Sequence, residues 1–451
     1  MYRAQRRILT AVAATLSLGT AVSWATEPAS REARLQELEN KVAALEAQEA
    51  TNSKDLANTV DSVLRDAERR SQLLANGGDT GAGYDNGFYI RAGDAWVLRP
   101  AAQFQFRNVT NFREDAQSDD DNDWENGFEV RRMRLDLGGT AFSKDLQYFI
   151  QWESNRNGGN LSLLEAWAKY MFSDQFGFWV GQVKDQVTHE FIMSSKNQLA
   201  ADTSLMDSLV GGGNTSYVQG AYLVYGNYNK DNPLNAVLGY TDGAASLNTD
   251  YVTSPFDYGI NGRLEYKVMG DWKNYRDFTA KATKDDLLVL GAATDFSERG
   301  DGNQITSTAD VQYENPMGLG LYGAFVDQYQ DADFTGTDSA NNLGFLAQAS
   351  YAFSGNWEVF GRYDQTLFDN DQALKQAGAS TGDLGDSFPE ITVGVNYYMG
   401  QDGSALHRAK FTVDLSYLPN GTPRSVTGLG MLDDNNGNAE WILRAQFQLL
   451  I

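Results

Sequence analysis

The chain alternates apolar and polar residues with a period of two from about residue 88 to its end. In the last segment, residues 441–451, every odd position is apolar, while Arg444, Gln446 and Gln448 fall between them. Successive side chains of a β-strand point to opposite faces, so this period predicts strands with one apolar and one polar face. One face suits lipid and the other suits water, as in a transmembrane β-barrel.

Sixteen segments carry this alternation, an even number as in outer-membrane barrels. They are residues 96–109, 128–142, 145–154, 163–172, 176–184, 215–228, 234–242, 258–268, 287–296, 304–314, 318–329, 343–353, 357–367, 390–399, 407–418 and 440–451. Short and long connections alternate between them, except that 269–286 is long where a short turn is expected. A misplaced strand boundary is one explanation of this exception. We predict an all-β fold, a 16-stranded antiparallel transmembrane β-barrel over residues 88–451.

The first 25 residues have the features of an export signal. Basic residues Arg3, Arg6 and Arg7 precede an apolar run over 8–22, and small residues follow up to Ala25. We expect cleavage after Ala25. An uncleaved membrane anchor is the alternative, although the run is short and interrupted by Thr and Ser. Because no later run reaches about 18 consecutive apolar residues, the exported protein would cross a membrane only as a β-barrel.

Residues 26–75 have a different composition from the rest of the chain. From residue 31 they lack glycine and proline, and apolar residues recur at heptad spacing at Leu35, Leu38, Val42 and Leu45. This pattern predicts a periplasmic coiled-coil helix that forms where something else brings chains together. A solvated amphipathic helix is the alternative. The glycines that follow predict a flexible Gly-rich hinge over residues 76–87.

Composition and charge narrow the function classes. The 451 residues include 36 Lys and Arg against 60 Asp and Glu, a formal net charge of −24. A nucleic-acid binder is therefore disfavoured, since phosphate neutralisation needs clustered cations on a basic surface. There is no cysteine, and His189 and His407 are the only histidines, so a zinc centre or a Ser-His-Asp hydrolase is disfavoured as well. We expect no cofactor, no metal and no enzymatic activity; a soluble β-sandwich, propeller or enzyme is the rival class.

The predicted water-facing positions near the barrel closure are strongly cationic. If the last strand pairs with the first, segments 407–418, 440–451, 96–109 and 128–142 are neighbours. Asp136 and Asp414 are their only acids on that face. The cations there are Arg99, Arg107, Arg132, Arg134, Arg408, Lys410 and Arg444. Cations facing a narrow pore of low dielectric attract passing anions, so the pattern predicts an anion path.

The long connection 185–214 is predicted to fold into the pore, because a structureless stretch of this length is usually functional or disordered. It carries acids at Asp185, Glu190, Asp202 and Asp207 beside Lys196. A basic wall that faces an acidic loop is also how an unspecific porin produces a transverse field. A general porin with little anion preference therefore remains an alternative.

Three motifs follow one another in the first half of the predicted barrel. They are Phe-Glu-Val-Arg-Arg-Met-Arg-Leu-Asp-Leu-Gly-Gly at 128–139, Gly-Gln-Val-Lys at 181–184 and Ser-Ser-Lys at 194–196. In order and spacing they resemble the phosphate-selective porin O and P family. The resemblance implies a sixteen-stranded barrel, a homotrimer, and a lumen whose Arg and Lys residues conduct phosphate-like anions. By motif match that role falls on Arg131, Arg132, Arg134, Lys184 and Lys196.

The chain also departs from the family pattern. Strand parity places Arg131 on the face opposite Arg132 and Arg134. Gln186 and Val187 stand where the family often has Pro-Phe, which concerns the shape of the loop inside the pore. The chain ends in an isoleucine rather than an aromatic residue, which concerns recognition of the last strand by the assembly machinery.

The sequence therefore predicts an exported outer-membrane porin that passively conducts small anions such as phosphate. Its expected partners are small anionic solutes, outer-membrane lipid and two further copies in a homotrimer. A general or organic-acid porin is the nearest alternative. A structural porin, whose coiled coil tethers the outer membrane to the cell wall, is an alternative of a different class.

Overall fold

The computed structural model describes residues 36, 39–43, 80–85, 87–93, 95–113, 123–353, 355–379, 385–432 and 438–451. The chain divides into two units, residues 1–76 and residues 77–451. In the first unit residues 36 and 39–43 are helical and exposed. The predicted export signal and most of the predicted coiled coil lie outside the described residues. No helix in the described ranges is both long and apolar enough to cross a membrane.

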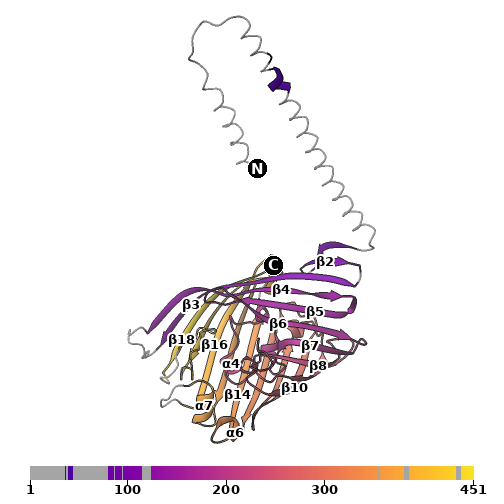
Figure 1. Cartoon of the computed structure of the whole chain (residues 1–451). Helices are drawn as coiled ribbons and strands as arrows, with labels where there is room; N and C mark the ends of the chain where they lie inside the picture. Colours follow the sequence, from indigo (N-terminus) through magenta and orange to yellow (C-terminus); the bar gives the residue numbers. More distant parts are fainter. Residues whose placement is uncertain are drawn as a thin grey trace, which may run out of the picture. The chain divides into compact units, whose positions relative to one another are not determined.

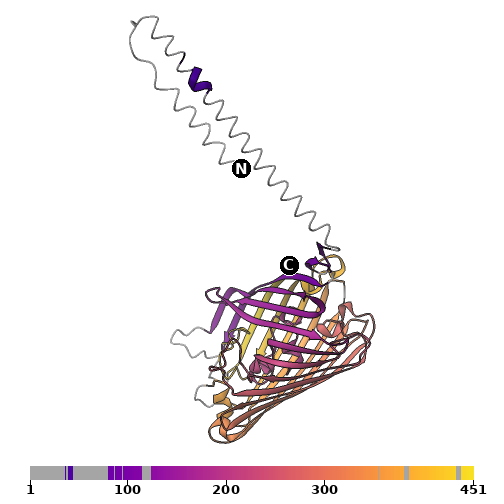
Figure 2. The ribbon, with the colours of Figure 1, turned by 45° about the vertical axis from the view of Figure 1, so that its right-hand side comes forward.

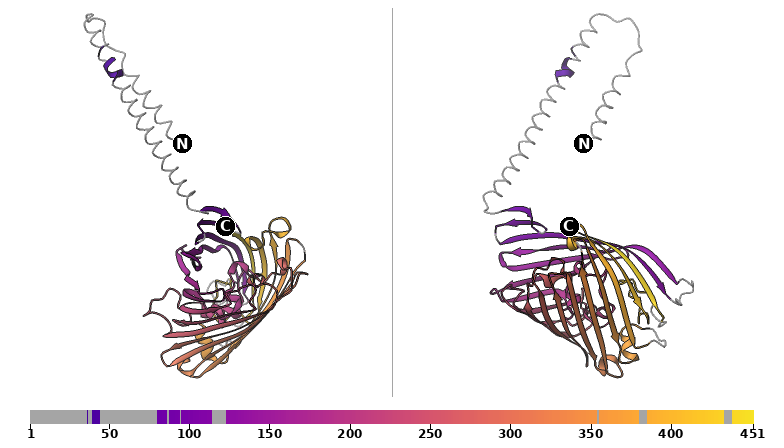
Figure 3. Two further views of the ribbon diagram at one scale, coloured as in Figure 1. Left: turned by 90° about the vertical axis from the view of Figure 1, so that its right-hand side faces the viewer. Right: turned by 180° about the vertical axis from the view of Figure 1, so that it is seen from behind.

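The second unit is a closed antiparallel β-barrel of sixteen strands, β3 to β18 (Figures 1 and 2). Each strand pairs with its neighbours in sequence, and β18 pairs with β3 from Glu440↔Arg113 to Leu450↔Gln103. This pairing closes the barrel, which Figure 3 shows from the side and from behind. The strands are β3 (Trp96–Arg113), β4 (Trp124–Ala141), β5 (Ser143–Ser154), β6 (Leu161–Met171), β7 (Phe176–Lys184), β8 (Tyr217–Tyr225), β9 (Leu234–Thr241), β10 (Tyr258–Met269), β11 (Leu287–Arg299), β12 (Gly302–Glu314), β13 (Leu319–Gln330), β14 (Ala340–Ala352), β15 (Trp357–Leu367), β16 (Ser387–Tyr398), β17 (Ala409–Leu418) and β18 (Glu440–Leu450). The predicted sixteen-stranded barrel is confirmed.

A short hairpin precedes the barrel. Strands β1 (Gly81–Tyr84) and β2 (Phe88–Ala92) pair with each other, and β2 continues the sheet from the start of β3. A side chain at Gly83 would lie 2.5 Å from the hydroxyl of Tyr89, so glycine permits this close pairing. Residues 81–84, which the sequence placed in the Gly-rich segment before the barrel, thus belong to a strand.

The alternation along the strands separates an outer apolar face from a polar interior. On β18, Trp441 and Leu443 are exposed on the outside, whereas Arg444, Gln446 and Gln448 are buried inside. Polar side chains are buried here because polypeptide fills part of the barrel interior. The core of the molecule therefore lies within the barrel, and the outer face offers apolar surface to a membrane.

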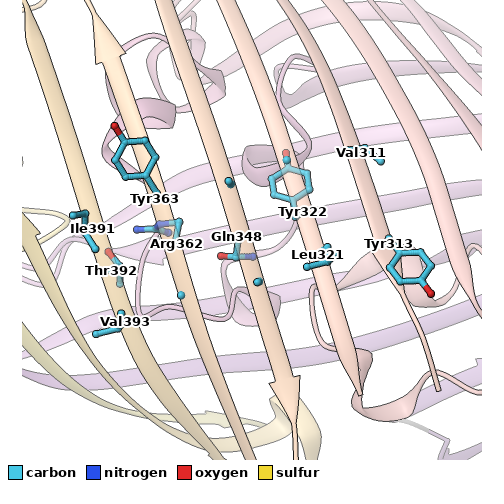
Figure 4. Close-up of a pocket in the computed structure, with 14 residues that line it drawn as sticks. Val311, Tyr313, Leu321, Tyr322, Gln348, Arg362, Tyr363, Ile391, Thr392 and Val393 are labelled. Carbon is cyan, nitrogen blue, oxygen red and sulfur yellow. The ribbon is translucent and has the colours of Figure 1, made fainter. Parts of the chain in front are cut away.

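An apolar concavity of about 620 Å³ interrupts the outer face of β12 to β16 (Figure 4). Small residues occupy adjacent positions across three strands, as the pairs Gly323↔Ala347 and Ala349↔Gly361 show. Tyr313 lies on the strand at one side of it. The missing side-chain volume on these strands produces the hollow, which is separate from the barrel interior.

The connection between β10 and β11 folds into the barrel. Trp272, Tyr275 and Phe278 are at most 3 % exposed. The connection contains two short turns, η2 (Asn274–Arg276), which includes Tyr275, and η3 (Ala280–Ala282), which follows Phe278. Both flanking strands begin and end close to their predicted positions. The strand boundary was therefore not misplaced. The connection is long because it buries aromatic residues inside the barrel.

Candidate functional site inside the barrel

The connection between β7 and β8 crosses the barrel interior, as the sequence predicts. Its helical turns are α3 (His189–Ile192), η1 (Ser195–Asn197), α4 (Leu205–Leu209) and α5 (Gly212–Thr215). Leu205, Met206 and Leu209 are at most 1 % exposed and belong to one apolar cluster with Tyr322 and Leu346 of the opposite wall. The loop therefore occupies the side of the interior that β13 to β18 enclose.

Acidic side chains of the barrel wall fix this loop through its backbone. The N–H of Leu205 donates to Glu390 at 3.0 Å, and the N–H of Met206 donates to Asp364 at 2.9 Å. Both N–H groups lie in the first turn of α4, where they have no partner within the helix. Carboxylates near a helix N-terminus also meet its positive end. These two wall carboxylates thus hold the loop instead of lining an open channel.

Asp202 of the loop lies at the centre of three arginines. Its Oδ1 is 2.9 Å from Nη2 of Arg131 and 2.7 Å from Nη2 of Arg132, and its Oδ2 pairs with Nη1 of Arg107. Burial disfavours the charged carboxylate, but the three guanidinium groups outweigh it and hold the pKa of Asp202 well below its usual range. The acidic loop and the basic wall are therefore joined by direct ion pairs.

A β-bulge brings both arginines of the double-Arg motif to Asp202. Gln105 of β3 pairs with Arg132, whereas the next residue, Phe106, pairs with Val130. Arg131 is the extra residue, and a bulge of this kind re-aims side chains that strict alternation would send to opposite faces. The expectation that Arg131 lies on the face opposite Arg132 is wrong for this reason.

Two more predicted cations are buried and paired within the barrel. Arg134 contacts Glu153 at 2.5 Å, and its Nη1 donates to a serine hydroxyl of the loop at 3.0 Å. Arg444 contacts Asp414 at 2.6 Å, and both of these side chains are fully buried. Such pairs hold the loop and the strands together. They offer little free positive charge to a passing ion.

Of the two cations predicted at the start of β17, Lys410 faces the interior as predicted and Arg408 does not. Lys410 faces inward and donates to the carbonyl of Gln198 at 2.5 Å. Arg408 lies before the strand, in the turn η5 (Leu406–Arg408), where it is exposed and donates to the carbonyl of Ala405 at 3.5 Å. Arg408 therefore does not join the inward-facing arginines, because the strand begins one residue after it.

A cavity of about 750 Å³ lies between the loop and the wall that β3 to β6 form. Three of its lining residues are basic, namely Arg99, Lys196 and Arg276, and Asp136 is its acid. Lys196 is 31 % exposed and lies 4.0 Å from Asp136. Arg276 belongs to the inward-folded connection after β10, and no sequence pattern marked it. Its place in the cavity wall depends on the inward fold of that connection.

A second cavity, of about 210 Å³, adjoins the first, since Trp167 lines both. Lys169 and Lys184 line it together with Glu165. The ammonium group of Lys184 donates to two carbonyl oxygens at the end of α3, at 2.7 and 2.9 Å. Lys184 thus anchors the loop at its first turn, and Lys169 is the freer cation of this cavity.

The described part of the chain contains no group of three or more His, Asp or Glu residues placed to hold a metal ion. The cavity walls carry fixed charges and hydrogen-bond donors, among them Arg99, Lys169 and Lys196. Such groups can bind and orient a solute in transit.

The family follows from residues 103–418, which match the model of the phosphate-selective porin O and P family. The chain belongs to this family. The match spans the loop inside the barrel and the strands from residue 103 of β3 to the end of β17, and it confirms the resemblance found in the sequence. The protein is thus an outer-membrane porin, and its barrel is a channel. No curated protein matches the chain.

Solved porins share the fold. The anion-selective porin from Comamonas acidovorans is 13% identical, with a TM-score of 0.51 over 78% of this chain and 99% of that chain. OmpF of Salmonella typhi, in complex with daunomycin, is 17% identical, with a TM-score of 0.51 over 80% of this chain and 100% of that chain. The outer membrane channel DcaP of Acinetobacter baumannii is 12% identical, with a TM-score of 0.50 over 80% of this chain and 99% of that chain. At these identities the likeness shows the barrel fold alone.

Proposed function

We propose that this porin conducts small anions, phosphate among them, by passive diffusion through the two cavities beside β3 to β9. One observation carries the proposal: cations outnumber acids on the walls of these cavities. The acids are Asp136 and Glu165. The cations are Arg99, Lys169, Lys184, Lys196 and Arg276. The chain as a whole has a net charge of −24, so the excess of cations on these walls comes from where the fold places them and not from the overall amino-acid composition.

The physical basis is the field inside a narrow, partly dehydrated passage. A fixed cation there lowers the energy of a passing anion more than it would in bulk water, because screening is weaker. Several cations in series let the ion move on instead of being trapped. The three arginines around Asp202 contribute little to this field, since their charge is largely compensated. Selectivity is therefore assigned to Arg99, Lys196 and Arg276.

The test is the ratio of chloride to potassium permeability in planar bilayers. We expect the triple variant Arg99→Gln, Lys196→Gln and Arg276→Gln to lose most of its anion preference, because these side chains are the cations of the 750 Å³ cavity. A matched triple variant, Arg408→Gln, Lys230→Gln and Lys375→Gln, removes three exposed cations outside the cavities and should keep the wild-type ratio. Equal ratios in the two variants would contradict the proposal.

We also propose a periplasmic coiled coil over residues 26–75, joined to a trimer of barrels. The heptad spacing supports it, and the residues described there, 36 and 39–43, are helical. A tether to the cell wall is a second candidate function of this segment. Deleting residues 26–80 separates the two roles. If conductance and trimers survive while envelope integrity fails, the segment is a tether; an unchanged envelope contradicts the tether.

A further inference from the structure

The 210 Å³ cavity combines aromatic walls with an ammonium group that forms no ion pair among the described residues. We propose that it binds a small aromatic carboxylate, such as a benzoate-type monoanion, through Lys169 and the indole N–H of Trp179. This inference rests on the proposed anion path, since the ligand enters through the adjoining 750 Å³ cavity. It adds a binding site and a ligand class to a passage otherwise described by its charge.

Lys169 has hydrogen-bonding capacity to spare. Its Nζ donates to Oδ1 of Asn227 at 2.7 Å and lies 5.9 Å from the ring centre of Trp167. Within the described ranges no carboxylate forms an ion pair with it. An ammonium group has three donors, so two remain for a ligand. Lys184, by contrast, already donates to the carbonyls at the end of α3.

The indole of Trp179 supplies a second donor. Its Nε1 is buried and has no hydrogen-bond partner, although the residue lines the cavity. Other inward-facing indoles are satisfied: Trp167 donates to Glu165 at 3.2 Å and Trp272 donates to the carbonyl of Asn232 at 2.8 Å. A buried donor without a partner is costly, and a ligand oxygen would relieve that cost.

Aromatic rings form the walls around these donors. Trp167 and Trp179 meet edge to face at 5.5 Å between ring centres, and Trp179 lies 5.3 Å from Tyr222. Tyr228 also lines the cavity. Rings in this arrangement favour an aromatic guest that stacks or packs edge-on. The volume lies below the 300–1,000 Å³ typical of sites for drug-sized ligands, so it suits roughly one ring.

The charges favour a monoanion over a phosphate dianion. Two ammonium groups, Lys169 and Lys184, line the cavity against one carboxylate, Glu165. The net charge of these three side chains therefore suits a ligand with one negative charge better than one with two. A carboxylate has two oxygens, one for the ammonium group and one for the indole N–H. The apolar ring of the ligand packs against the apolar walls of the cavity, whereas phosphate has no apolar group that could do so. The site thus complements an aromatic carboxylate better than an inorganic oxyanion.

The experiment is block of the single-channel current of the full-length protein by benzoate, with acetate and phosphate as comparison probes. We expect benzoate to block at a concentration about ten-fold below acetate. Trp179→Phe keeps the ring and removes the donor, and it should weaken benzoate block about ten-fold. Lys169→Met should abolish it. Lys267→Met is the matched control, because Lys267 also lies over an indole, 5.3 Å from the ring centre of Trp272, but donates to a backbone carbonyl at an exposed position.

The outcomes separate this site from the proposed function. Equal block by benzoate and acetate, or benzoate block unchanged in both Trp179→Phe and Lys169→Met, would overturn the aromatic carboxylate site. If the channel stayed anion-selective in that case, the proposed function would stand without the site. A cation-selective wild-type channel would overturn the proposed function itself. Heat stability of each variant in detergent, equal to that of Lys267→Met, shows that the barrel is intact.

Discussion

Nη2 of Arg132 lies 2.7 Å from Oδ1 of Asp202, so the double-Arg motif of β4 binds a carboxylate of the chain itself. The neighbouring Arg131 binds the same oxygen at 2.9 Å. A buried carboxylate with three guanidinium partners fixes the position of the loop that crosses the barrel. The loop position in turn decides which cations remain open to a solute.

Asp202→Asn should destabilise the protein, because it leaves three buried arginines without their shared counter-charge. Removing one partner of a buried ion pair costs about 3 to 5 kcal/mol. The measurement is the heat-induced loss of barrel structure in detergent. Asp145→Asn, at an exposed carboxylate, is the control and should melt like the wild type. An unchanged transition for Asp202→Asn would show that the three arginines find other partners.

Arg131→Ala and Arg132→Ala should have effects of similar size on stability. Strict strand parity would put Arg131 toward lipid and make its substitution harmless, whereas the bulge places both guanidinium groups on Asp202. Hydrogen bonds to a charged group contribute about 1.5 to 3 kcal/mol each. Heat denaturation of the two variants side by side provides the comparison. A wild-type transition for Arg131→Ala alone would argue against the bulge.

Tyr275→Ala should raise the single-channel conductance. The ring of Tyr275 stacks on His189 with 3.9 Å between ring centres, and this contact joins the inward-folded connection 270–286 to the loop. Replacing a buried aromatic side chain by alanine leaves a cavity and typically lowers the free energy of unfolding by about 3 to 5 kcal/mol. We expect both segments to loosen and the passage to widen. Tyr275→Phe keeps the stack, so its conductance should match the wild type; equal conductance in Tyr275→Ala would contradict a narrowing role.

The same connection should make stability depend on pH. Burial raises the pKa of Asp277 to about 7. The folded protein then holds a proton that the unfolded chain releases above its ordinary pKa of 3.8. The contribution of Asp277 to the free energy of unfolding is therefore fully present below about pH 4 and is lost as the pH rises toward 7. Melting temperatures from pH 4.5 to 8 should fall less in Asp277→Asn than in the wild type. Parallel curves for the two proteins would contradict the assignment.

The strand layout could be predicted because lipid and water select residues on alternate positions. β7 and β15 begin and end at the predicted residues, and all sixteen strands are found. Alternation is a local property, so it survives without any knowledge of tertiary contacts. The prediction of which face a side chain occupies fails where a strand carries one extra residue, as at Arg131. A β-bulge at that residue reverses the alternation on one side of the bulge relative to the other.

The state of the candidate site could not be predicted from parity. Parity gives the face of Arg107, but not that Asp202 compensates its charge, since this contact joins β3 to a loop far along the sequence. Asp414 and Arg444, by contrast, are paired residues of neighbouring strands, so parity places both on the same face. The position of Arg276 could not be predicted for a related reason. It lies in a connection, and only tertiary folding brings it to the cavity wall. Free charge in the pore is thus a property of the folded loop.

The reversal potential of the purified wild-type protein in a planar bilayer, under a KCl gradient, tests the central claim most directly. Because cations outnumber acids along the cavities, we expect a reversal potential with the sign of an anion-selective channel, in which chloride is more permeant than potassium. Addition of phosphate should then lower the chloride current as it competes for the same path. A potential of the opposite sign, or none, would contradict the account and show that the acidic residues of the chain govern the pore.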